Sequence, residues 1–420
     1  REHGGDFARM RDAEARSVAR LLVGPTARNL VRVFELRQRL REQARHDAEP
    51  VRRVHVIGAG TMGGDIAAWC ALRGCRVSLQ DRETDLIAPA VRRAARLFER
   101  RLRDRRAVRD ALDRLIPDPA GDGVTGADLV LEAVPEKLEL KQSLLRELEP
   151  RLPPGALFAT NTSSLPLERI GEALAHPRRL VGLHFFNPVA KMPLLEVVVG
   201  AQTAPGVRAR ALAFARTLDK LPVAVASRPG FLVNRVLMPY LLEAVRLVEE
   251  GHTPETVDRA AEDFGMPMGP LALADAVGLD ICADVGAVLA REIPGMPALP
   301  ARLQQLVEAG HTGRKSGRGF YVHGTRRSRR SRPGPVDDEL RDRLVLALIN
   351  ACVAALREEV VADADSLDGA VIFGTGFAPF RGGPLHYARD QGAEDLRQRL
   401  EVLAARHGGH LRPDPGWADL

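Results

Sequence analysis

Between residues 51 and 228, short apolar runs rich in β-branched residues alternate with longer stretches whose apolar positions have helical spacing. The strands of a parallel sheet are covered by helices on both faces, so each strand is a nearly continuous apolar run. The alternation therefore predicts an α/β fold with a doubly wound parallel sheet. The predicted strands cover residues 54–57, 76–81, 128–134, 156–160, 180–188, 194–199 and 222–225.

The first predicted strand leads directly into Gly58, Gly60 and Gly63, and residues 65–72 then have a helical pattern. In the spacing Gly-x-Gly-x-x-Gly, the first glycine permits a tight turn, the second admits a pyrophosphate, and the third lets the helix pack on the strand. The helix N-terminus offers N–H groups and a positive dipole end to the phosphates. This stretch predicts a dinucleotide site.

The second predicted strand supports this interpretation because it ends in a carboxylate, Asp81. An acid at this place accepts hydrogen bonds from the adenosine ribose hydroxyls and repels a 2′-phosphate, which favours NAD over NADP. Arg82 beside it could instead pair with that phosphate. Together these features predict a Rossmann-type NAD-binding domain over residues 51–228. A glycine-rich loop of purely structural use is the alternative.

Beyond Pro229 and Gly230, which predict a domain boundary, the pattern is helical to the end of the sequence. Two parts of this helical region resemble each other. The matching positions are Glu249-Glu250 with Glu358-Glu359, Asp258 with Asp368, and residues 264–271 with 377–385. We therefore predict an all-α, internally duplicated C-terminal region with domains at 229–325 and 336–420, joined by a polar linker at 324–335. Chance similarity of two helical segments is the alternative.

Residues 1–50 also have a helical pattern, with one apolar stripe among arginines and acids. The stripe consists of Leu21, Leu22, Leu30, Val31, Val33, Phe34, Leu36 and Leu40. An amphipathic segment of this kind cannot form a core alone, so we expect a connecting segment. Because the sequence begins at Arg1 and not at a methionine, we expect it to be a piece of a longer polypeptide.

The formal net charge of +6 comes mainly from arginines, which alternate with acids, as at 92–114. This mixture is typical of solvated helix faces, and an aromatic content of only 4% also argues against a nucleic-acid partner. A positive surface does favour an anionic substrate such as a nucleotide or coenzyme A. The four cysteines lack metal spacing, which predicts reduced thiols and no metal site. With no long apolar run and no signal peptide, we expect a cytoplasmic protein without a membrane span.

Three polar residues stand at the ends of predicted strands: Ser163, His184 and Glu196. An alcohol cannot lose a hydride unless its O–H proton is also taken, and a histidine can take that proton near neutral pH. A carboxylate behind the histidine fixes its tautomer and stabilises the imidazolium. The serine hydroxyl can hold the reacting oxygen. A core histidine satisfied by backbone groups is the alternative.

Five motifs, in this order, make residues 51–400 similar to the L-3-hydroxyacyl-CoA dehydrogenases. They are the glycine motif at 58–64, Asn-Thr-Ser-Ser-Leu at 161–165, His-Phe-Phe-Asn-Pro at 184–188, Leu-Glu-Val-Val at 195–198 and Pro-Gly-Phe-Leu-Val-Asn-Arg at 229–235. The duplicated helical half resembles the α-subunit of the bacterial fatty-acid oxidation complex more than the shorter, single-copy dehydrogenases. The first 50 residues resemble that subunit's connector from an N-terminal enoyl-CoA hydratase part.

The resemblance implies a role for each matching residue. His184 is the general base, Glu196 orients and stabilises its imidazole, and Ser163 binds the substrate oxygen. Asn234 and Phe373 lie at substrate-binding positions, although Phe373 stands where the multifunctional relatives have a tyrosine. The implied cofactor contacts are Gly58, Gly60, Met62, Gly63, Asp81, Val134, Pro135, Glu136, Lys141, Ser163 and Asn187.

The resemblance also implies the activity: NAD-dependent oxidation of (3S)-3-hydroxyacyl-CoA to 3-ketoacyl-CoA in fatty acid β-oxidation. We expect an acyl-CoA substrate, a hydratase domain upstream in the same polypeptide, and a thiolase subunit or a second copy of the chain as partner. One alternative is a 3-hydroxy-acid dehydrogenase that does not use coenzyme A. Another, of a different class, is a cofactor-binding structural protein that has lost turnover.

Overall fold

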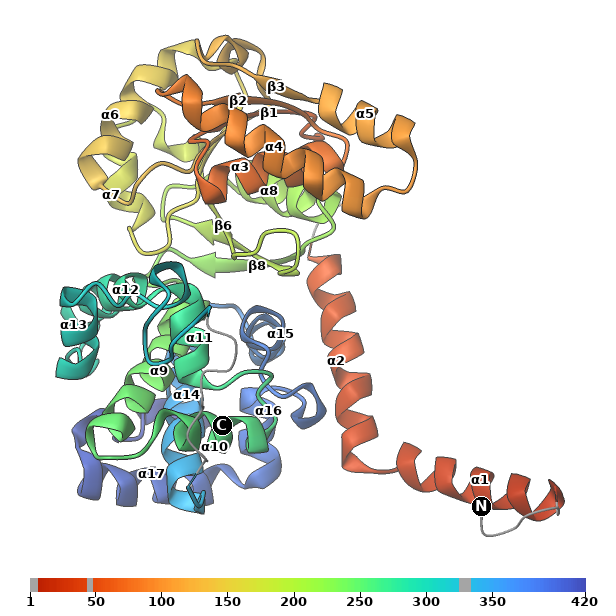
Figure 1. Cartoon of the computed structure of the whole chain (residues 1–420), viewed down its shortest axis with the longest axis vertical. Helices are drawn as coiled ribbons and strands as arrows, with labels where there is room; N and C mark the ends of the chain where they lie inside the picture. Colours follow the sequence, from red (N-terminus) through yellow and green to blue (C-terminus); the bar gives the residue numbers. More distant parts are fainter. Residues whose placement is uncertain (1–6, 44–47, 325–333) are drawn as a thin grey trace.

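The computed structural model describes residues 7–43, 48–324 and 334–420. Within these residues, an eight-stranded sheet with the order β3-β2-β1-β4-β5-β6-β7-β8 forms the nucleotide-binding part (Figure 1). The strands are β1 (Arg53–Ile57), β2 (Arg76–Gln80), β3 (Leu115–Pro117), β4 (Leu129–Glu132), β5 (Leu157–Thr160), β6 (Leu180–Phe185), β7 (Leu194–Val199) and β8 (Leu221–Ala226). The predicted α/β fold is confirmed. The prediction lacks only β3, whose three residues are too few to give a periodic pattern.

One strand pair departs from the predicted parallel arrangement. β7 runs antiparallel to β6, with His184 directly opposite Glu196, and β8 runs parallel to β7. Only residues 186–193 connect β6 to β7, whereas a parallel crossover needs about a dozen residues or more. The predicted parallel arrangement is therefore wrong for the β6–β7 pair alone, and the doubly wound sheet is parallel elsewhere. The prediction that Glu196 ends a strand is also wrong, because it lies inside β7.

Helices cover both faces of the sheet. They are α3 (Thr61–Leu72), α4 (Thr84–Arg101), α5 (Arg105–Asp113), α6 (Leu138–Leu148), α7 (Leu167–Gly171) and α8 (Pro205–Thr217). α3, α4 and α8 lie together over one face, where they bury strand residues such as Val56 and Leu131 (Figure 1). Val130 and Phe158 belong to a second hydrophobic cluster, which continues into the helical region. Burial on both faces explains why the strands are apolar throughout.

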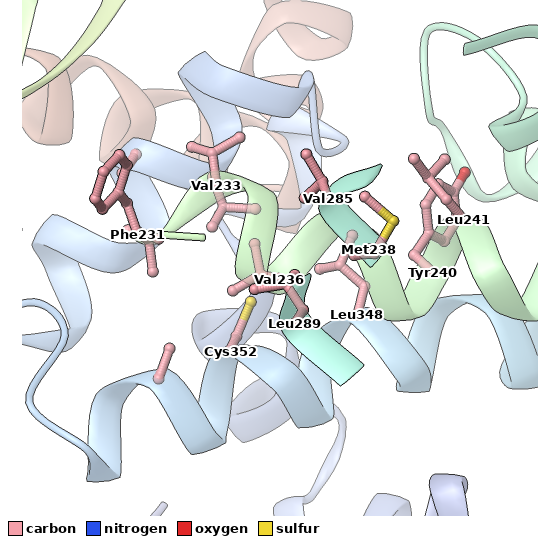
Figure 2. Packing of buried hydrophobic residues seen from close by; sticks show 14 of the residues in the cluster. Phe231, Val233, Val236, Met238, Tyr240, Leu241, Val285, Leu289, Leu348 and Cys352 are labelled. Atoms are coloured by element: carbon pink, nitrogen blue, oxygen red, sulfur yellow. The ribbon is translucent and has the colours of Figure 1, made fainter. Parts of the chain in front are cut away.

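The helical region follows the sheet. Its helices are α9 (Val233–Glu249), α10 (Pro254–Phe264), α11 (Pro270–Val277), α12 (Leu279–Glu292), α13 (Ala301–Glu308), α14 (Asp338–Arg357), α15 (Ala364–Thr375), α16 (Pro384–Gln391) and α17 (Ala393–His407). α9 and α14 pack side by side, with Val236, Leu348 and Cys352 close together (Figure 2). Their packing joins the two predicted copies around one core.

Two ion pairs at this contact are counterparts of each other. In each pair, an arginine near the start of one copy's long helix contacts a glutamate just after the other copy's long helix. Arg235, near the start of α9, pairs with Glu358 just after α14. Arg343, near the start of α14, pairs with Glu250 just after α9. Reciprocal contacts of this kind define an isologous interface, here within one chain.

A buried aspartate in each copy also has the same task. Asp258 in α10 accepts hydrogen bonds from two N–H groups in the first turn of α11, at 2.8 and 3.1 Å. Asp368 in α15 accepts hydrogen bonds from two N–H groups in the first turn of α16, also at 2.8 and 3.1 Å. These matching contacts agree with the predicted duplication of the helical region.

The described residues before the sheet form α1 (Phe7–Leu22) and α2 (Pro25–Glu42). α2 lies along the second helical copy, where Arg32 pairs with Asp365 and Asp368, and it reaches β8 (Figure 1). All of α1 is described, and none of its residues is buried. Of the predicted apolar stripe, only Leu36 and Leu40 are buried.

Most of the predicted polar linker, residues 325–333, lies outside the described residues. The predicted domain bounds remain predictions. In the described parts of the chain, no helix combines the length and the apolar character needed to cross a lipid bilayer.

Candidate active site

The carboxyl ends of β1, β4, β5 and β6 lie along one edge of the sheet. The chain order reverses between β1 and β4, since β1 leads outward to β2 and β4 leads outward to β5 on the other side. Open α/β sheets bind their ligands in the crevice at such a switch point. The loops after these strands contain most of the predicted site residues, so the topology brings those residues together.

The loop after β1 has the shape that a dinucleotide requires. Gly58 has a φ of +100°, and a Cβ atom there would lie 2.7 Å from the carbonyl oxygen of Ala133. A Cβ atom on Gly63 would lie 1.8 Å from the Gly58 carbonyl oxygen, so only glycine lets α3 pack this closely. A Cβ atom on Gly60 would meet no described atom within 4 Å. Gly60 caps α3 without a side-chain hydrogen bond from the described residues, which leaves an open helix start that fits a pyrophosphate.

Asp81 lies beside this loop. Its Oδ2 accepts a hydrogen bond from the Ala59 N–H at 2.6 Å, and its Oδ1 has a long contact of 3.3 Å with the Glu83 N–H. A carboxylate oxygen can accept more than one hydrogen bond, so Asp81 retains capacity for ribose hydroxyls. The side chain of Arg82 is 86% exposed and lies 3.5 Å from Glu83. The geometry fits the predicted preference for NAD.

One carboxylate oxygen fixes the loop after β5. Oε1 of Glu136 accepts hydrogen bonds from the N–H groups of Ser163 and Ser164, at 2.8 and 3.1 Å. The hydroxyls of Thr162 and Ser163 lie 2.5 and 3.3 Å from the same oxygen. Burial opposes the charge of Glu136, but Lys141 and these donors outweigh it and hold its pKa below the usual range. The position of Ser163 therefore depends on an ionised Glu136.

Lys141 lies beneath this loop. It is 1% exposed, and its Nζ is 2.9 Å from both carboxylate oxygens of Glu132 at the end of β4. The same Nζ lies 3.3 Å from Glu136 and 3.4 Å from the carbonyl oxygen of Val134. Lys141 thus fixes the segment that contains Val134, Pro135 and Glu136. Its direct contact with the cofactor stays a prediction.

His184 and Glu196 form a buried pair across the β6–β7 hairpin. Nδ1 of His184 lies 2.6 Å from Oε2 of Glu196, and the two residues are 6% and 0% exposed. Because Nδ1 faces the carboxylate, we assign the proton of the neutral imidazole to Nδ1, which makes Nε2 the acceptor. The imidazole packs against the rings of Phe186 and Phe231, with centroids 4.5 and 5.6 Å away. A carboxylate partner favours the catalytic interpretation over a histidine satisfied by backbone groups.

Two asparagines connect the loops of this edge. Oδ1 of Asn161 accepts a hydrogen bond from the Phe185 N–H at 3.0 Å, next to His184. Nδ2 of Asn234, in the first turn of α9, donates to the Ser163 carbonyl oxygen at 3.1 Å. The structure thus brings Ser163, His184 and Asn234 to one edge. The predicted cofactor residue Asn187 is exposed two residues beyond β6, and Met62 lies in the first turn of α3.

Phe373, the other predicted substrate residue, is half-buried near the end of α15. A Cβ atom on the adjacent Gly374 would lie 2.8 Å from the Leu194 side chain and 2.9 Å from that of Val233. The second helical copy therefore packs on the strand that contains Glu196. A substrate contact by Phe373 stays a prediction.

Three residues that hold these loops are not among the predicted site residues: Glu132, Thr160 and Asn161. Glu132 is 0% exposed and accepts hydrogen bonds from Lys141 and from the Thr160 hydroxyl. An acid inside an apolar run, nine positions before a lysine, is the signal that could have identified Glu132. Asn161 could have been identified as a polar residue directly after a strand.

A Rossmann-type crevice with a glycine motif, an acid directly after the second strand and a buried histidine–carboxylate pair is typical of a dinucleotide-dependent dehydrogenase. Residues 53–228 match the NAD binding domain of 3-hydroxyacyl-CoA dehydrogenase, and residues 230–323 match the C-terminal domain of that enzyme. The chain belongs to the 3-hydroxyacyl-CoA dehydrogenase family, and its cofactor is NAD.

Individual relatives agree with this assignment. The chain is 33% identical over 429 residues to the fatty acid oxidation complex subunit alpha of Shewanella sp. strain ANA-3, covering 96% of this chain and 60% of the relative. The structure of 3-hydroxybutyryl-CoA dehydrogenase from Escherichia coli K12 has a TM-score of 0.80 at 28% identity, covering 88% of this chain and 98% of the other. That of (S)-3-hydroxybutyryl-CoA dehydrogenase from Ralstonia eutropha has a TM-score of 0.63 at 34% identity, covering 66% and 100%. The chain spans about 60% of the length of the curated relatives.

Proposed function

We propose that this chain oxidises (3S)-3-hydroxyacyl-CoA to 3-ketoacyl-CoA in fatty acid β-oxidation, with His184 as the general base. The observation that carries the proposal is the pair of His184 Nδ1 and Glu196 Oε2, 2.6 Å apart, at the sheet edge that has the glycine motif. The family supports the NAD-dependent reaction. The acyl-CoA substrate and the pathway are supported by the names of the relatives.

The first task of the site is removal of the hydroxyl proton. With Nδ1 directed at Glu196, Nε2 of His184 has the lone pair that can take this proton. The charge that then forms on the imidazole lies beside the Glu196 carboxylate, which stabilises it. Bound NAD supplies the acceptor for the hydride that leaves C3 of the substrate. Loss of the proton and loss of the hydride together convert the alcohol to the ketone.

The second task is to hold the substrate oxygen against this base. We assign it to the hydroxyl of Ser163, whose loop is fixed by Glu136 on one side and by Asn234 on the other. Asn234 lies at the start of α9 and Phe373 near the end of α15, so both helical copies would border the acyl chain. Phe373 has no hydroxyl, and we expect it to contribute apolar contact only.

The same proposal extends to the polypeptide and its partners. The relatives are longer than this chain, and α1 exposes large apolar side chains, with Phe7, Leu21 and Leu22 at 79%, 71% and 67%. Exposed apolar stripes of this kind are usually covered by a partner surface. We propose that this chain is the dehydrogenase portion of a hydratase–dehydrogenase polypeptide in the cytoplasm, with a thiolase subunit or a second copy as partner.

The experiment is a substrate panel with the purified chain, followed by NADH absorbance. We expect turnover with (3S)-3-hydroxybutyryl-CoA and longer homologues, none with the (3R) isomers, and no hydration of an enoyl-CoA. Equal rates with free 3-hydroxybutyrate would favour a dehydrogenase that does not use coenzyme A. Equal efficiency with NADP would contradict the role of Asp81. NADH binding without any turnover would indicate a structural cofactor-binding protein.

A further inference from the structure

We propose that the start of α9 is a positioning element of the catalytic pair: the backbone N–H groups of Leu232 and Val233 hold the Glu196 carboxylate against His184. The inference rests on the proposed role of His184 as the base. It assigns a reaction-specific task to a backbone segment at the predicted domain boundary.

The carboxylate of Glu196 divides its two oxygens between the helical region and the histidine. Oε1 accepts hydrogen bonds from the N–H groups of Leu232 and Val233, at 3.1 and 2.8 Å. Oε2 lies 2.6 Å from Nδ1 of His184. Glu196 is 0% exposed, and a buried carboxylate needs such donors in place of water. The two N–H groups therefore fix the rotamer that directs Oε2 at the imidazole.

An unusual backbone turn aims these N–H groups at Glu196. Gly230 and Phe231 both have positive φ, +72° and +51°. Glycine adopts this region freely, whereas a residue as bulky as phenylalanine rarely does. Consecutive N–H groups in such turns form a concave site for an anion, and here the anion is the Glu196 carboxylate.

The ring of Phe231 holds the turn in place. Phe231 is 0% exposed, and its ring lies 5.6 Å from the imidazole of His184 at an interplanar angle of 60°. Figure 2 shows Phe231 and Val233 at the start of α9, beyond the contact of Val236 with Cys352. The segment therefore packs on the catalytic pair itself, in addition to the helix–helix core.

The consequence is that the pair is assembled from two parts of the molecule. Glu196 and His184 belong to the sheet, whereas the donors to Glu196 are the first residue of α9 and the residue before it. A shift of α9 relative to β7 would release Oε1 and free the carboxylate to leave His184. The rate of the chemical step thus depends on this backbone contact.

The test removes one N–H group and keeps the helix. Val233 is the first residue of α9, so Val233→Pro deletes one donor to Glu196 without removing a hydrogen bond inside the helix. Leu232 before it has αR backbone angles, which a following proline disfavours, so the variant's folding is checked before its kcat is read. Val233→Ala is the matched control, which loses the methyl groups and keeps the N–H. Because hydrogen bonds to charged groups are strong, we expect Val233→Pro to lower kcat about tenfold or more relative to Val233→Ala. KM for the acyl-CoA and the affinity for NADH should change much less.

Repeating the Val233 substitutions in a Glu196 variant separates the positioning role of the N–H group from a purely structural role. In the Glu196→Ala variant the acceptor of both hydrogen bonds is absent, so Val233→Pro should cost less than about twofold beyond Val233→Ala. An equal loss of kcat in both backgrounds, or equal kcat for Val233→Pro and Val233→Ala, would overturn the proposal. Wild-type protein without any 3-hydroxyacyl-CoA oxidation would overturn the proposed function, and this inference with it.

A pair of Phe231 variants decides the question if Val233→Pro fails to fold. Phe231→Gly and Phe231→Val both remove the ring, but only glycine adopts the left-handed backbone without strain. We expect kcat of Phe231→Val to be several-fold lower than that of Phe231→Gly, with NADH affinity retained in both. Equal kcat values in the two variants would contradict the proposed role of the turn.

Discussion

Two buried charge clusters in this molecule look alike and serve different ends. At the sheet edge, His184 pairs with Glu196. Between the helical copies, Nε of Arg343 lies 2.6 Å from Glu243 and its Nη2 lies 2.8 Å from Glu250, while His410 contacts Glu243 at 2.8 Å. In both places a buried carboxylate has a cationic or ionisable partner.

The difference lies in what each cluster leaves open. The ring of His184 uses Nδ1 for Glu196, which in the proposed mechanism leaves Nε2 to take the reacting proton. The guanidinium of Arg343 donates to two carboxylates, those of Glu243 and Glu250. A guanidinium stays protonated at every pH at which proteins are folded, so it cannot take up a proton. Burial opposes the charge of Glu243, but His410 and Arg343 outweigh it and lower its pKa. His410 also faces its carboxylate through one ring nitrogen, Nε2, but it lies between the helical copies and not at the edge of the sheet. A buried histidine–carboxylate pair therefore indicates chemistry only where its other ring nitrogen lies at a ligand crevice.

The largest expected effect comes from removing His184 from its pair with Glu196. His184→Gln should lower kcat by about 10²–10⁴-fold, the usual contribution of a general base, while NADH affinity is retained. The matched control is His55→Gln, because His55 is a buried histidine with both ring nitrogens occupied, by Ser78 at 2.8 Å and Gln80 at 2.9 Å. We expect His55→Gln to reduce stability and to retain most of kcat in the folded fraction. A comparable loss of kcat in both variants would contradict the distinction between a histidine with one ring nitrogen available and a histidine with both nitrogens occupied.

The next largest effect is expected from removing Arg343 from its cluster with Glu243 and Glu250. Arg343→Met leaves the buried Glu243 without its main cation, so the free energy of unfolding should fall by about 3–5 kcal/mol. The folded fraction should turn over at the wild-type rate. Arg397→Met is the control: its pairs with Glu394 and Glu401 lie on the surface, where water screens them, so its free energy of unfolding should change far less than that of Arg343→Met. Urea unfolding and kcat of each variant check both statements, and loss of kcat in folded Arg343→Met would contradict them.

A smaller effect is expected on the pH dependence of stability, through the buried aspartates Asp258 and Asp368. Burial raises the pKa of Asp258 and that of Asp368 to about 6, although backbone N–H groups oppose this rise in both. Since each folded pKa lies above its unfolded value of 3.8, the folded state binds protons more tightly. The resulting stability is present below pH 3.8 and is lost as the pH rises through about 6.

The Asp258→Asn and Asp368→Asn variants measure this effect. Relative to either variant, the unfolding free energy of the wild type should fall by about 3 kcal/mol at most between pH 4 and pH 7. Unfolding in urea at several pH values is the measurement. A difference that does not change with pH would mean that these carboxyls titrate normally.

Local patterns predicted much of this molecule. The glycine motif, the strands and the residues that follow them are consecutive in the sequence, so apolar runs and glycine spacing identify them. The direction of β7 could not be recognised from its own residues, although the short connection at 186–193 excluded a crossover. Contacts between distant segments left no local pattern. Arg235 and Glu358 are 123 positions apart, and Val233 donates to Glu196 from 37 positions away through a backbone group.

The most direct test of the central claim, that His184 and Glu196 act as one base, is a double-mutant cycle. Single-turnover formation of NADH from (3S)-3-hydroxybutyryl-CoA is measured by stopped flow for His184→Gln, Glu196→Gln and the double variant. Because residues that act as a unit are far from additive, the double variant should be within about twofold of His184→Gln. A double variant slowed by the product of the two single effects would contradict the claim.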